Sequence, residues 1–288
     1  MFFLVNGAVR YSRGKRAVDP SIRSSQIVMT ILNIGTKLLK LNGLPWTLLY
    51  TLYWSFRYFL KIDSTGLFKL LLKLEEKHDL PGFNTPVTAG ALWDLLPWEK
   101  EHGEEWTVSA EWKQSLIDEV LRKYIRRGAA VLEIGSGAGR WTAVLQPLAG
   151  KLVAIDVSSR AIALCKARFA TATNCEFHLA GNIDLGFIPD GSIEAIWSFD
   201  VFVHINPEDT DRYIAEFKRV FASGGIAVIH HPKKGGVHGG CRSRMTDRLF
   251  NAMLEKHGLT LDAQFDSWGE NGRFNLYRHG DCISVFHA

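Results

Sequence analysis

The stretch Val131–Gly139 constrains the fold of this chain more than any other part of the sequence. It reads VLEIGSGAG, a short apolar run that passes directly into three glycines at alternate positions. An apolar run followed by glycines and a helix is typical of a buried parallel strand whose turn lies against a bound nucleotide. The next apolar run ends at Asp156, where a carboxylate is suited to accept hydrogen bonds from two ribose hydroxyls.

The spacing of the glycines indicates which kind of nucleotide the turn would bind. A dinucleotide fingerprint, Gly-x-Gly-x-x-Gly, that began at Gly135 would need a third glycine where Arg140 stands. The chain instead has an acid, Glu133, two residues before the first of three glycines at alternate positions. Because a carboxylate in a partly dry cleft repels a pyrophosphate and attracts a cation, the pattern favours a positively charged nucleoside.

At these residues the chain resembles the class I S-adenosylmethionine-dependent methyltransferases, whose cofactor carries an ammonium and a sulfonium group and no phosphate. The resemblance covers roughly residues 106–288 and leaves residues 1–90 outside it. It implies that Glu133 and the glycine turn face the methionine half of the cofactor, and that Val157 touches the adenine. The cofactor-binding residues expected from it are Glu133, Gly135, Ser136, Gly137, Gly139, Arg140, Trp141, Asp156, Val157, Asn182, Ile183, Ser198 and Asp200.

Asn182 is a departure from that family, which usually has Gly-Asp after the third strand with the acid on the adenine amino group. An amide oxygen can accept from that amino group, and an amide nitrogen can donate to a ring nitrogen. We therefore expect Asn182 to replace the acid, with Ile183 packed on the ring. The segment from Ser198 to Ile205 resembles the part of the family that lines the transferred methyl group. It contains no N-P-P-Y or D-P-P-Y, so methylation of DNA amino groups is not expected.

Runs typical of strands and helices alternate after the glycine turn. This alternation predicts an α/β fold with a doubly wound, mostly parallel sheet and helices on both faces. The resemblance implies seven strands with an antiparallel last strand. The expected strands after the first are 152–155, 176–179, 193–198, 226–230, 259–265 and 282–286, and the expected helices are about 140–148, 159–170, 207–221 and 246–256.

Charge and composition divide the chain into three expected parts: a basic, apolar helical extension over 1–80, a linker and tryptophan-rich entry helix over 81–125, and the nucleotide-binding domain over 126–288. Residues 1–73 hold 11 Lys and Arg against two Asp, a net charge of +9. Because the net charge of the whole chain is +4, the remaining residues carry −5. An acidic domain is unfavourable for a phosphate backbone, and no nucleic-acid partner is expected. The four cysteines are scattered and predict reduced thiols.

The first 80 residues leave two alternatives open. Helical patterns run over 27–44 and 67–77, and between them Pro45 begins an aromatic run over 46–60 that is shorter than the ~20 residues a membrane span needs. Tryptophan, tyrosine and basic residues favour a membrane-surface anchor. The other alternative is a helical cap that packs on itself or on the main domain. Because basic residues follow Met1–Val5 instead of preceding it, no secretory signal is expected, and the predicted localisation is cytoplasmic, peripheral to a membrane under the first alternative.

Four tryptophans lie between residues 93 and 112, shortly before the glycine turn, and Ser109 is the expected N-cap of a helix over about 110–124. As a group these aromatics are expected either to cover the nucleotide site or simply to fill a core. The four are Trp93, Trp98, Trp106 and Trp112.

Transfer of a methyl group to a hydroxyl also needs a base, and histidine is suited to that role near neutral pH. His204 follows the fourth strand, and His230 and His231 end the fifth, so all three are expected at the site edge of the sheet; His238 lies in a nearby basic loop. We expect His204 to be the base, then His231. A metal site of Asp200, His230 and His231 is an alternative, but no ligand spacing within one element supports it, and no metal is expected.

The expected acceptor is a small molecule or glycan, first a hydroxyl of a glycan or lipid-linked sugar. The stretches 103–106, 197–204 and 265–270 look like those of bacterial methyltransferases that accompany glycan assembly. A hydrophobic small molecule such as a quinone, polyketide or phenol is the second expectation. A non-catalytic scaffold that uses its amino-terminal helices is the third.

Overall fold

The computed structural model describes residues 24–181, 183, 185–235, 242–277 and 280–288. They form two compact units: a helical unit that contains the described residues up to Pro97 together with Arg242, and a sheet unit of Trp98–Gly235 and Ser243–Ala288. The sequence predicts boundaries after residues 80 and 125, whereas the helical unit extends to Pro97. The reason is that α4 (Pro86–Trp93) places Leu92 in the core of the helical unit.

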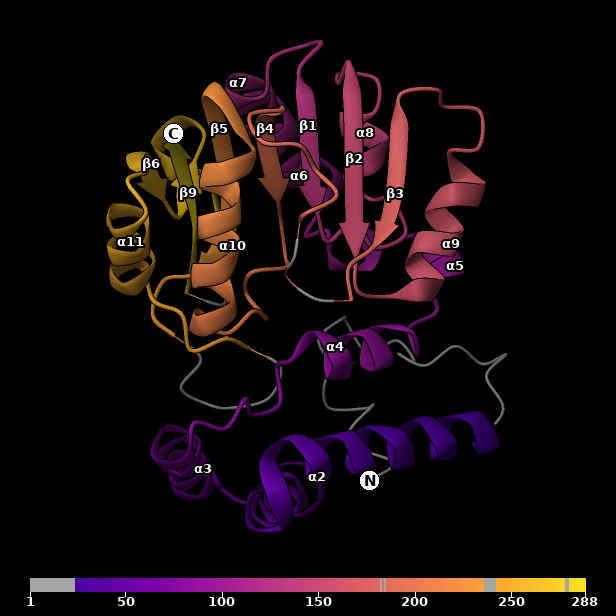
Figure 1. Ribbon diagram of the computed structural model, residues 1–288, viewed down its shortest axis with the longest axis vertical. Coiled ribbons are helices and arrows are strands. Elements are labelled where there is room, and N and C mark those ends of the chain that lie inside the picture. Colours follow the sequence, from indigo (N-terminus) through magenta and orange to yellow (C-terminus); the bar gives the residue numbers. More distant parts are fainter. Residues whose placement is uncertain (1–23, 182, 184, 236–241, 278–279) are drawn as a thin grey trace. The chain divides into compact units, whose positions relative to one another are not determined.

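The sheet unit is built on seven strands in the order β3-β2-β1-β4-β5-β9-β6 (Figure 1). The first five pair in parallel, and β9 runs antiparallel between β5 and β6. The predicted doubly wound, mostly parallel sheet is therefore confirmed. The strands are β1 (Ala130–Ile134), β2 (Lys151–Asp156), β3 (Cys175–Leu179), β4 (Ile193–Ser198), β5 (Phe221–Pro232), β6 (Thr260–Phe265) and β9 (Asp281–His287).

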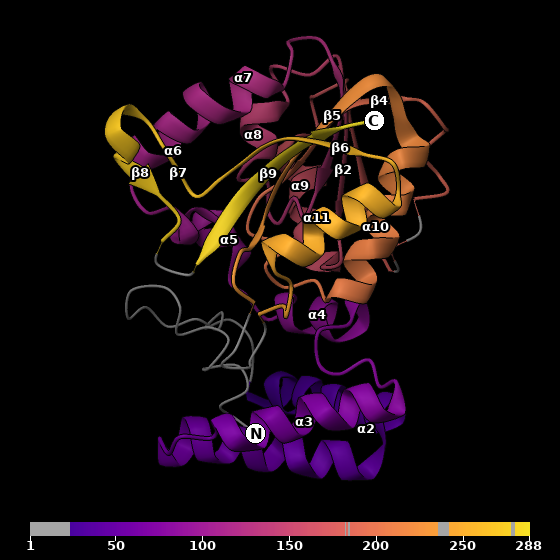
Figure 2. The same ribbon diagram turned by 90° about the vertical axis from the view of Figure 1, so that its left-hand side faces the viewer.

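Helices cover both faces of this sheet, as Figure 2 shows with α6–α8 on one side and α10 and α11 on the other. One buried cluster joins the sheet to α10 (Pro207–Val220) and α11 (Asp247–Lys256). The second joins the opposite face to α6 (Ala110–Leu116), the π-helical turn η3 (Ile117–Leu121) and α8 (Thr142–Leu145), with α7 (Arg122–Tyr124) following η3. α9 (Ser159–Arg168) packs on β2 and β3. Ser109 caps α6 as predicted, because its hydroxyl accepts the Trp112 N–H at 3.1 Å.

A short hairpin of β7 (Ser267–Trp268) and β8 (Phe274–Asn275), joined by the 3₁₀ turn η4 (Glu270–Gly272), was not apparent from the sequence. It places Trp268 edge-on against Trp112, with ring centroids 5.5 Å apart. Both rings are buried in the cluster beneath α6. Trp112 is thus a core residue of the sheet unit.

The helical unit consists of α2 (Ser24–Trp54), the π-helical turn η1 (Ser55–Leu60), α3 (Thr65–His78) and α4. The predicted interruption before Pro45 is confirmed, since Gly43 leaves helical geometry at φ 76°. A buried hydrogen bond joins α2 to α3 in this unit: the Trp46 indole N–H donates to Glu75 at 2.9 Å. None of the described helices combines the length and apolarity needed to cross a membrane.

Candidate cofactor site

The glycine turn follows β1 at the edge where the parallel strands end. The N–H groups of Gly135 and Ser136 donate to the Ile155 carbonyl at 2.8 and 3.1 Å, which ties the turn to β2. Gly135 has φ 76°, and a Cβ there would lie 2.1 Å from Val201. The turn therefore requires glycine both for its backbone angles and for its close contact with the segment after β4.

Asp156 at the end of β2 is held against this turn. One carboxylate oxygen accepts the Gly137 N–H and the other accepts the Ser158 N–H, both at 2.8 Å. A carboxylate oxygen can accept from more than one donor, so this group is chemically suited to hydroxyl donors. The structure thus brings together the acid and the glycines that the sequence paired, in an arrangement suited to a ribose.

Glu133 lies beneath the turn and is 1% exposed. One of its oxygens accepts the Thr142 hydroxyl at 2.6 Å, and the other has no hydrogen-bond partner among the described residues. Burial, reinforced by the negative charge of Asp156, raises the pKa of Glu133 to about 7. A buried carboxylate with a free acceptor site fits a cationic ligand, directly or through a water molecule, and does not fit a pyrophosphate.

A buried polar chain runs beside the turn from Arg140 through Asp200 and His230 to Asp281. The Arg140 guanidinium bonds the Asp200 carboxylate at 2.6 Å, and the Asp200 N–H donates to His230 Nδ1 at 3.1 Å. On its other side, the His230 ring lies 3.4 Å from Asp281. Asp200 has φ 64°, a left-handed conformation that is uncommon outside glycine and that this bonding holds in place.

The contacts between these four polar residues shift the pKa values of Asp200 and His230. Although burial opposes ionisation, the charge of Arg140 and the contact with His230 hold the pKa of the Asp200 carboxyl well below its usual range. Burial would also lower the pKa of His230, but the carboxylates of Asp200 and Asp281 outweigh it and raise that pKa. Asp200 is consequently an ionised hydrogen-bond acceptor and a poor proton acceptor.

The three candidate histidines occupy different surroundings. His204 is half-buried in the turns after β4, where its backbone N–H donates to the Val201 carbonyl at 2.9 Å. His231 is fully buried and stacks on Phe250 of α11 with ring centroids 3.9 Å apart. Burial lowers the pKa of His231 to about 4. Since adjacent residues of a strand point to opposite faces, only His230 of this pair joins Asp200.

Other predicted cofactor residues lie close to the turn or in the core beneath it. Ser198 is buried and its hydroxyl donates to the Ile134 carbonyl at 2.9 Å, which links β4 to β1. Trp141 is buried between Trp197 and Phe199, so it supports the turn from the core. Ile183 is buried and Val157 packs against the same cluster, whereas Asn182 and His238 fall outside the described residues. The individual roles of all these residues stay predictions.

Trp98 belongs to the predicted aromatic group and lies against the glycine turn. Its ring is 3.1 Å from the position that a Cβ on Gly137 would take, and Trp106 packs beside it at 5.4 Å between ring centroids. Trp98 begins α5 (Trp98–Glu101), which two hydrogen bonds of 2.8 Å between Glu99 and Arg160 join to α9. The 3₁₀ turn η2 (Glu104–Trp106) follows.

Two residues that contact the predicted site residues, Thr142 and Asp281, are not marked by any motif in the sequence. Thr142, the partner of Glu133, is an ordinary residue of a helix, and Asp281 lies on the last strand, far along the chain from Asp200. Only the antiparallel insertion of β9 beside β5 brings Asp281 to His230.

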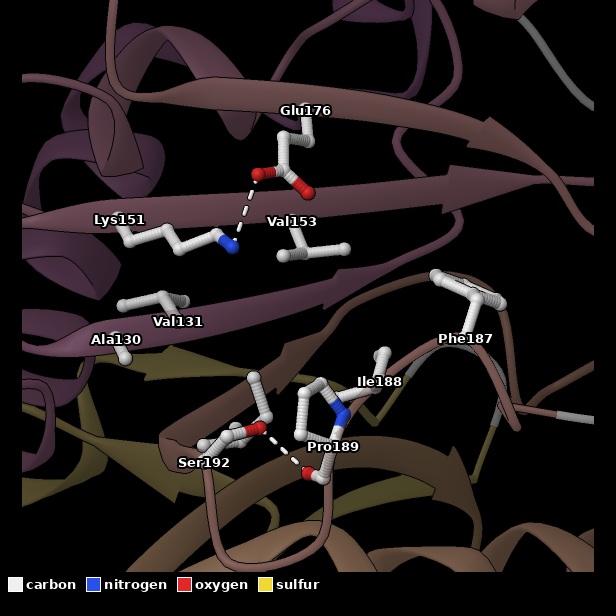
Figure 3. Close-up of a pocket in the computed structure, with 10 residues that line it drawn as sticks. Ala130, Val131, Lys151, Val153, Glu176, Phe187, Ile188, Pro189 and Ser192 are labelled. Carbon is white, nitrogen blue, oxygen red and sulfur yellow. Dashed lines mark hydrogen bonds and ion pairs between the residues drawn. The ribbon is translucent and has the colours of Figure 1, made fainter.

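A small pocket lies away from this site, near the starts of β1, β2 and β4 (Figure 3). The close-up shows Lys151 paired with Glu176 at 2.9 Å across its rim, with Phe187, Ile188 and Pro189 on the other side. Its lining is mainly apolar and includes none of the predicted site residues. Within the described part of the chain, no group of three or more His, Cys, Asp or Glu is arranged to hold a metal ion.

Comparison with known proteins agrees with this geometry. Residues 131–225 match the family model described as a methyltransferase domain. Two probable S-adenosylmethionine-dependent methyltransferases from two strains of Mycobacterium tuberculosis are each 27% identical over 104 residues, which is 36% of this chain and 36% of theirs. The match thus spans about a third of the length of these relatives.

Two solved structures share the fold. A methyltransferase of Haloferax volcanii, solved in complex with a methyltransferase activator, is 15% identical with a TM-score of 0.52, over 68% of this chain and 97% of that one. An S-adenosylmethionine-dependent methyltransferase from Mesorhizobium loti is 12% identical with a TM-score of 0.50, over 63% of this chain and 99% of that one.

The strand order, the antiparallel β9 and the acid–glycine turn define a class I S-adenosylmethionine-dependent methyltransferase fold. Residues 131–225 of the sheet unit match a methyltransferase-domain model, and relatives similar to this chain are described as S-adenosylmethionine-dependent, so S-adenosylmethionine is the cofactor that these similarities imply. The chemistry of the donor set fits this cofactor, because Glu133 provides a negative charge for its cationic half and Asp156 provides acceptors for its ribose.

Proposed function

We propose that this protein transfers a methyl group from S-adenosylmethionine to a hydroxyl group, first of all one on a glycan or lipid-linked sugar. The observation that carries the proposal is the contact between Asp156 and Gly137, which assembles a ribose-binding acid and a glycine turn over the buried Glu133. An acceptor attached to a lipid agrees with the first alternative for residues 1–80, a membrane-surface anchor.

In this proposal the chain contributes mainly alignment and one proton acceptor. The bound cofactor supplies a methyl group that is already activated by its sulfonium. Glu133, the glycine turn and Asp156 hold the nucleoside and methionine parts, and Trp98 covers the turn from α5. Holding two reactants in line replaces most of the entropy cost of a bimolecular reaction.

His204 is the proposed base, because it is half-buried in the segment after β4 that carries Asp200. It takes the proton of the acceptor hydroxyl as the oxygen forms its bond to the methyl carbon and the bond from that carbon to sulfur breaks. Asp200, which stays ionised, accepts a hydrogen bond from a second hydroxyl of the acceptor and orients it. His231 is not included in this scheme, since its low pKa and its contacts with Phe250 suit a structural role.

The proposal is tested first by calorimetry with S-adenosylmethionine. Asp156→Asn is expected to weaken binding roughly 10- to 100-fold, since it removes the charge that accepts the ribose hydroxyls. A wild-type chain that binds a nicotinamide dinucleotide and ignores S-adenosylmethionine would contradict the cofactor assignment.

The transfer step is tested by an acceptor screen that follows release of S-adenosylhomocysteine. His204→Gln is expected to bind the cofactor like the wild type and to lose roughly 10²- to 10⁴-fold in turnover. Full turnover by this variant would exclude His204 as the base. Turnover only with quinones, polyketides or phenols would favour the hydrophobic acceptor, and cofactor binding without turnover on any acceptor would favour a scaffold.

A further inference from the structure

Large apolar side chains are exposed mainly on the helical unit. Sixteen are exposed within the described part of the chain, and eleven of these belong to the helical unit, which is less than a third of that part. Nine of the eleven lie between Met29 and Ile62. Scattered apolar residues are normal on a protein surface, but a concentration on one element indicates a binding surface.

Three of these exposed residues lie on one side of the second half of α2. Leu44, Leu48 and Leu52 follow one another at four-residue spacing and are 58%, 61% and 44% exposed. Trp46 and Tyr53, on the opposite side of the same helix, are at most 1% exposed and form the core of the unit. The helix is therefore apolar on both sides, although only one side is covered by its own unit.

Four hydroxyl groups along this helix and the turn after it are hydrogen-bonded to the backbone of the same segment. Thr47, Thr51 and Ser55 each donate to the carbonyl four residues earlier, at 2.9, 2.8 and 2.8 Å, and Thr36 does the same at 2.8 Å. A hydroxyl that is satisfied by its own helix needs no water and can enter an apolar medium at little cost. The exposed side between Leu44 and Ser55 therefore requires little solvation.

The charges of this segment have a single sign and lie at its flanks. No aspartate or glutamate occurs from Ser24 to Ile62, and no charged residue of either sign occurs from Leu44 to Phe56. The basic residues lie before and after that uncharged part: Lys37, Lys40, Arg57 and Lys61. An apolar helical side with flanking cations matches the boundary between the acyl chains and the anionic headgroups of a membrane.

We propose that the side of α2 and η1 that carries Leu44, Leu48 and Leu52 docks on the surface of a membrane that contains anionic phospholipid. The four flanking cations hold the segment at the headgroups, and the leucines enter the outer part of the acyl layer without spanning it. A second copy of the chain is a poorer occupant, because it would bring two sets of like-charged side chains together. This docking does not depend on the proposed methyl transfer.

The test is flotation of the full chain with vesicles of phosphatidylcholine alone and with 30–40% phosphatidylglycerol, a composition chosen to span roughly that of anionic cell membranes. Binding is expected to the anionic vesicles and to fall with added salt. Leu48→Glu/Leu52→Glu should weaken it on the order of 100-fold, because two buried leucines are replaced by charges. Lys37→Gln/Lys40→Gln should weaken it on the order of 20- to 30-fold, at about fivefold per cation.

Leu249→Glu provides the matched control, since Leu249 is an exposed leucine of α11 in the sheet unit and should leave flotation unchanged. All variants replace exposed residues, so unchanged circular dichroism and cofactor binding would show that they fold. Wild-type flotation by Leu48→Glu/Leu52→Glu would overturn the proposal, as would failure of the wild type to bind either vesicle. A wild-type dimer in light scattering that Leu48→Glu/Leu52→Glu converts to a monomer would assign the surface to a second copy instead.

Discussion

Glu133 is a buried acid whose environment opposes its ionisation until a cation arrives. It is 1% exposed, and the negative charge of Asp156 adds to the effect of burial. The raised pKa means that the fold makes ionisation of this acid less favourable than in water, whereas a ligand with an ammonium and a sulfonium would favour the ionised form. We therefore propose that binding of the cofactor and the charge of Glu133 are coupled.

The free energy of unfolding should depend on pH because ionised Glu133 destabilises the folded state. Because the pKa of Glu133 rises from 4.5 to about 7 on folding, its stabilising contribution is complete below 4.5 and is lost as pH rises through 7. Glu133→Gln should therefore be more stable than the wild type at pH 8, by about 3 kcal/mol, and should show no such advantage at pH 4.5. Urea unfolding at the two pH values measures this difference, and equal curves at pH 8 would contradict the raised pKa.

Cofactor affinity should show the opposite trend. If S-adenosylmethionine binds the ionised acid, its affinity for the wild type should increase about tenfold from pH 6 to pH 8, as expected for a group that titrates near 7. Glu133→Gln should lack this increase, and it reports any titration of the ligand itself. Calorimetry at several pH values provides the measurement, and parallel profiles for the two proteins would remove Glu133 from the binding site.

Gly135 is the position in the turn with the tightest contact. Gly135→Ala would place a Cβ 2.1 Å from Val201 at a φ of 76°, so it should lower the free energy of unfolding by at least about 2 kcal/mol. Gly181→Ala is the control, since nothing lies within 4 Å of its Cβ position. Thermal unfolding of both variants provides the measurement, and equal melting temperatures would mean that the turn can move away from Val201.

At the scale of elements, α5 is a short helix held in place by contacts rather than by its own propensity. One end carries Trp98 against Gly137, and Glu99 pairs with Arg160 through two parallel hydrogen bonds. A four-residue helix has little stability alone, so the pair on α9 decides where Trp98 rests. We infer that α5 covers the cofactor and that its release sets how fast the cofactor leaves.

Arg160→Ala should accelerate dissociation of S-adenosylmethionine several-fold, because α5 loses its attachment to α9. The same change should alter the melting temperature little, since ion pairs at the surface contribute roughly 0–1 kcal/mol. Stopped-flow tryptophan fluorescence measures the dissociation rate. Arg273→Ala, which breaks the exposed pair with Glu111, is the matched control and should leave that rate unchanged.

At the scale of the whole molecule, the chain has two units with separate cores. The core of the helical unit contains Trp46, Tyr50 and Tyr53, whereas those of the sheet unit surround β1 and the strands beside it. Because the cores are separate, we expect each unit to respond to mutation separately from the other. All the predicted cofactor-binding residues lie in the sequence of the sheet unit, so we expect cofactor binding to depend on that unit.

Trp46→Ala should destabilise the helical unit by about 3–5 kcal/mol, because it leaves a cavity and deprives Glu75 of its indole donor. At a temperature where the helical unit of this variant is still folded, cofactor affinity should stay within about twofold of the wild type. Leu132→Ala in β1 is the reciprocal variant and should weaken binding. Thermal unfolding with and without S-adenosylmethionine distinguishes them, and loss of binding in Trp46→Ala would show that the units unfold together.

Much of the fold and part of the site could be predicted because the signals are local. The helix break at Pro45, the alternation of strands and helices, and the acid–glycine turn each depend on residues within a few positions of one another. The extent of the helical unit to Pro97, the β7–β8 hairpin and the partner of Glu133 depend on packing between distant segments. No periodic pattern in the sequence reports such packing.

The sequence by itself determined the strand, the turn and the two acids that make this a nucleoside-binding fold, because backbone angles and strand ends are properties of short segments. Only the tertiary structure decided that His230 and not His231 joins Asp200, and that Asp281 completes this polar chain. Both outcomes depend on which face of β5 each side chain takes and on the insertion of β9 beside it. Charges that control one another through a buried contact can be recognised only once the sheet has brought them within reach.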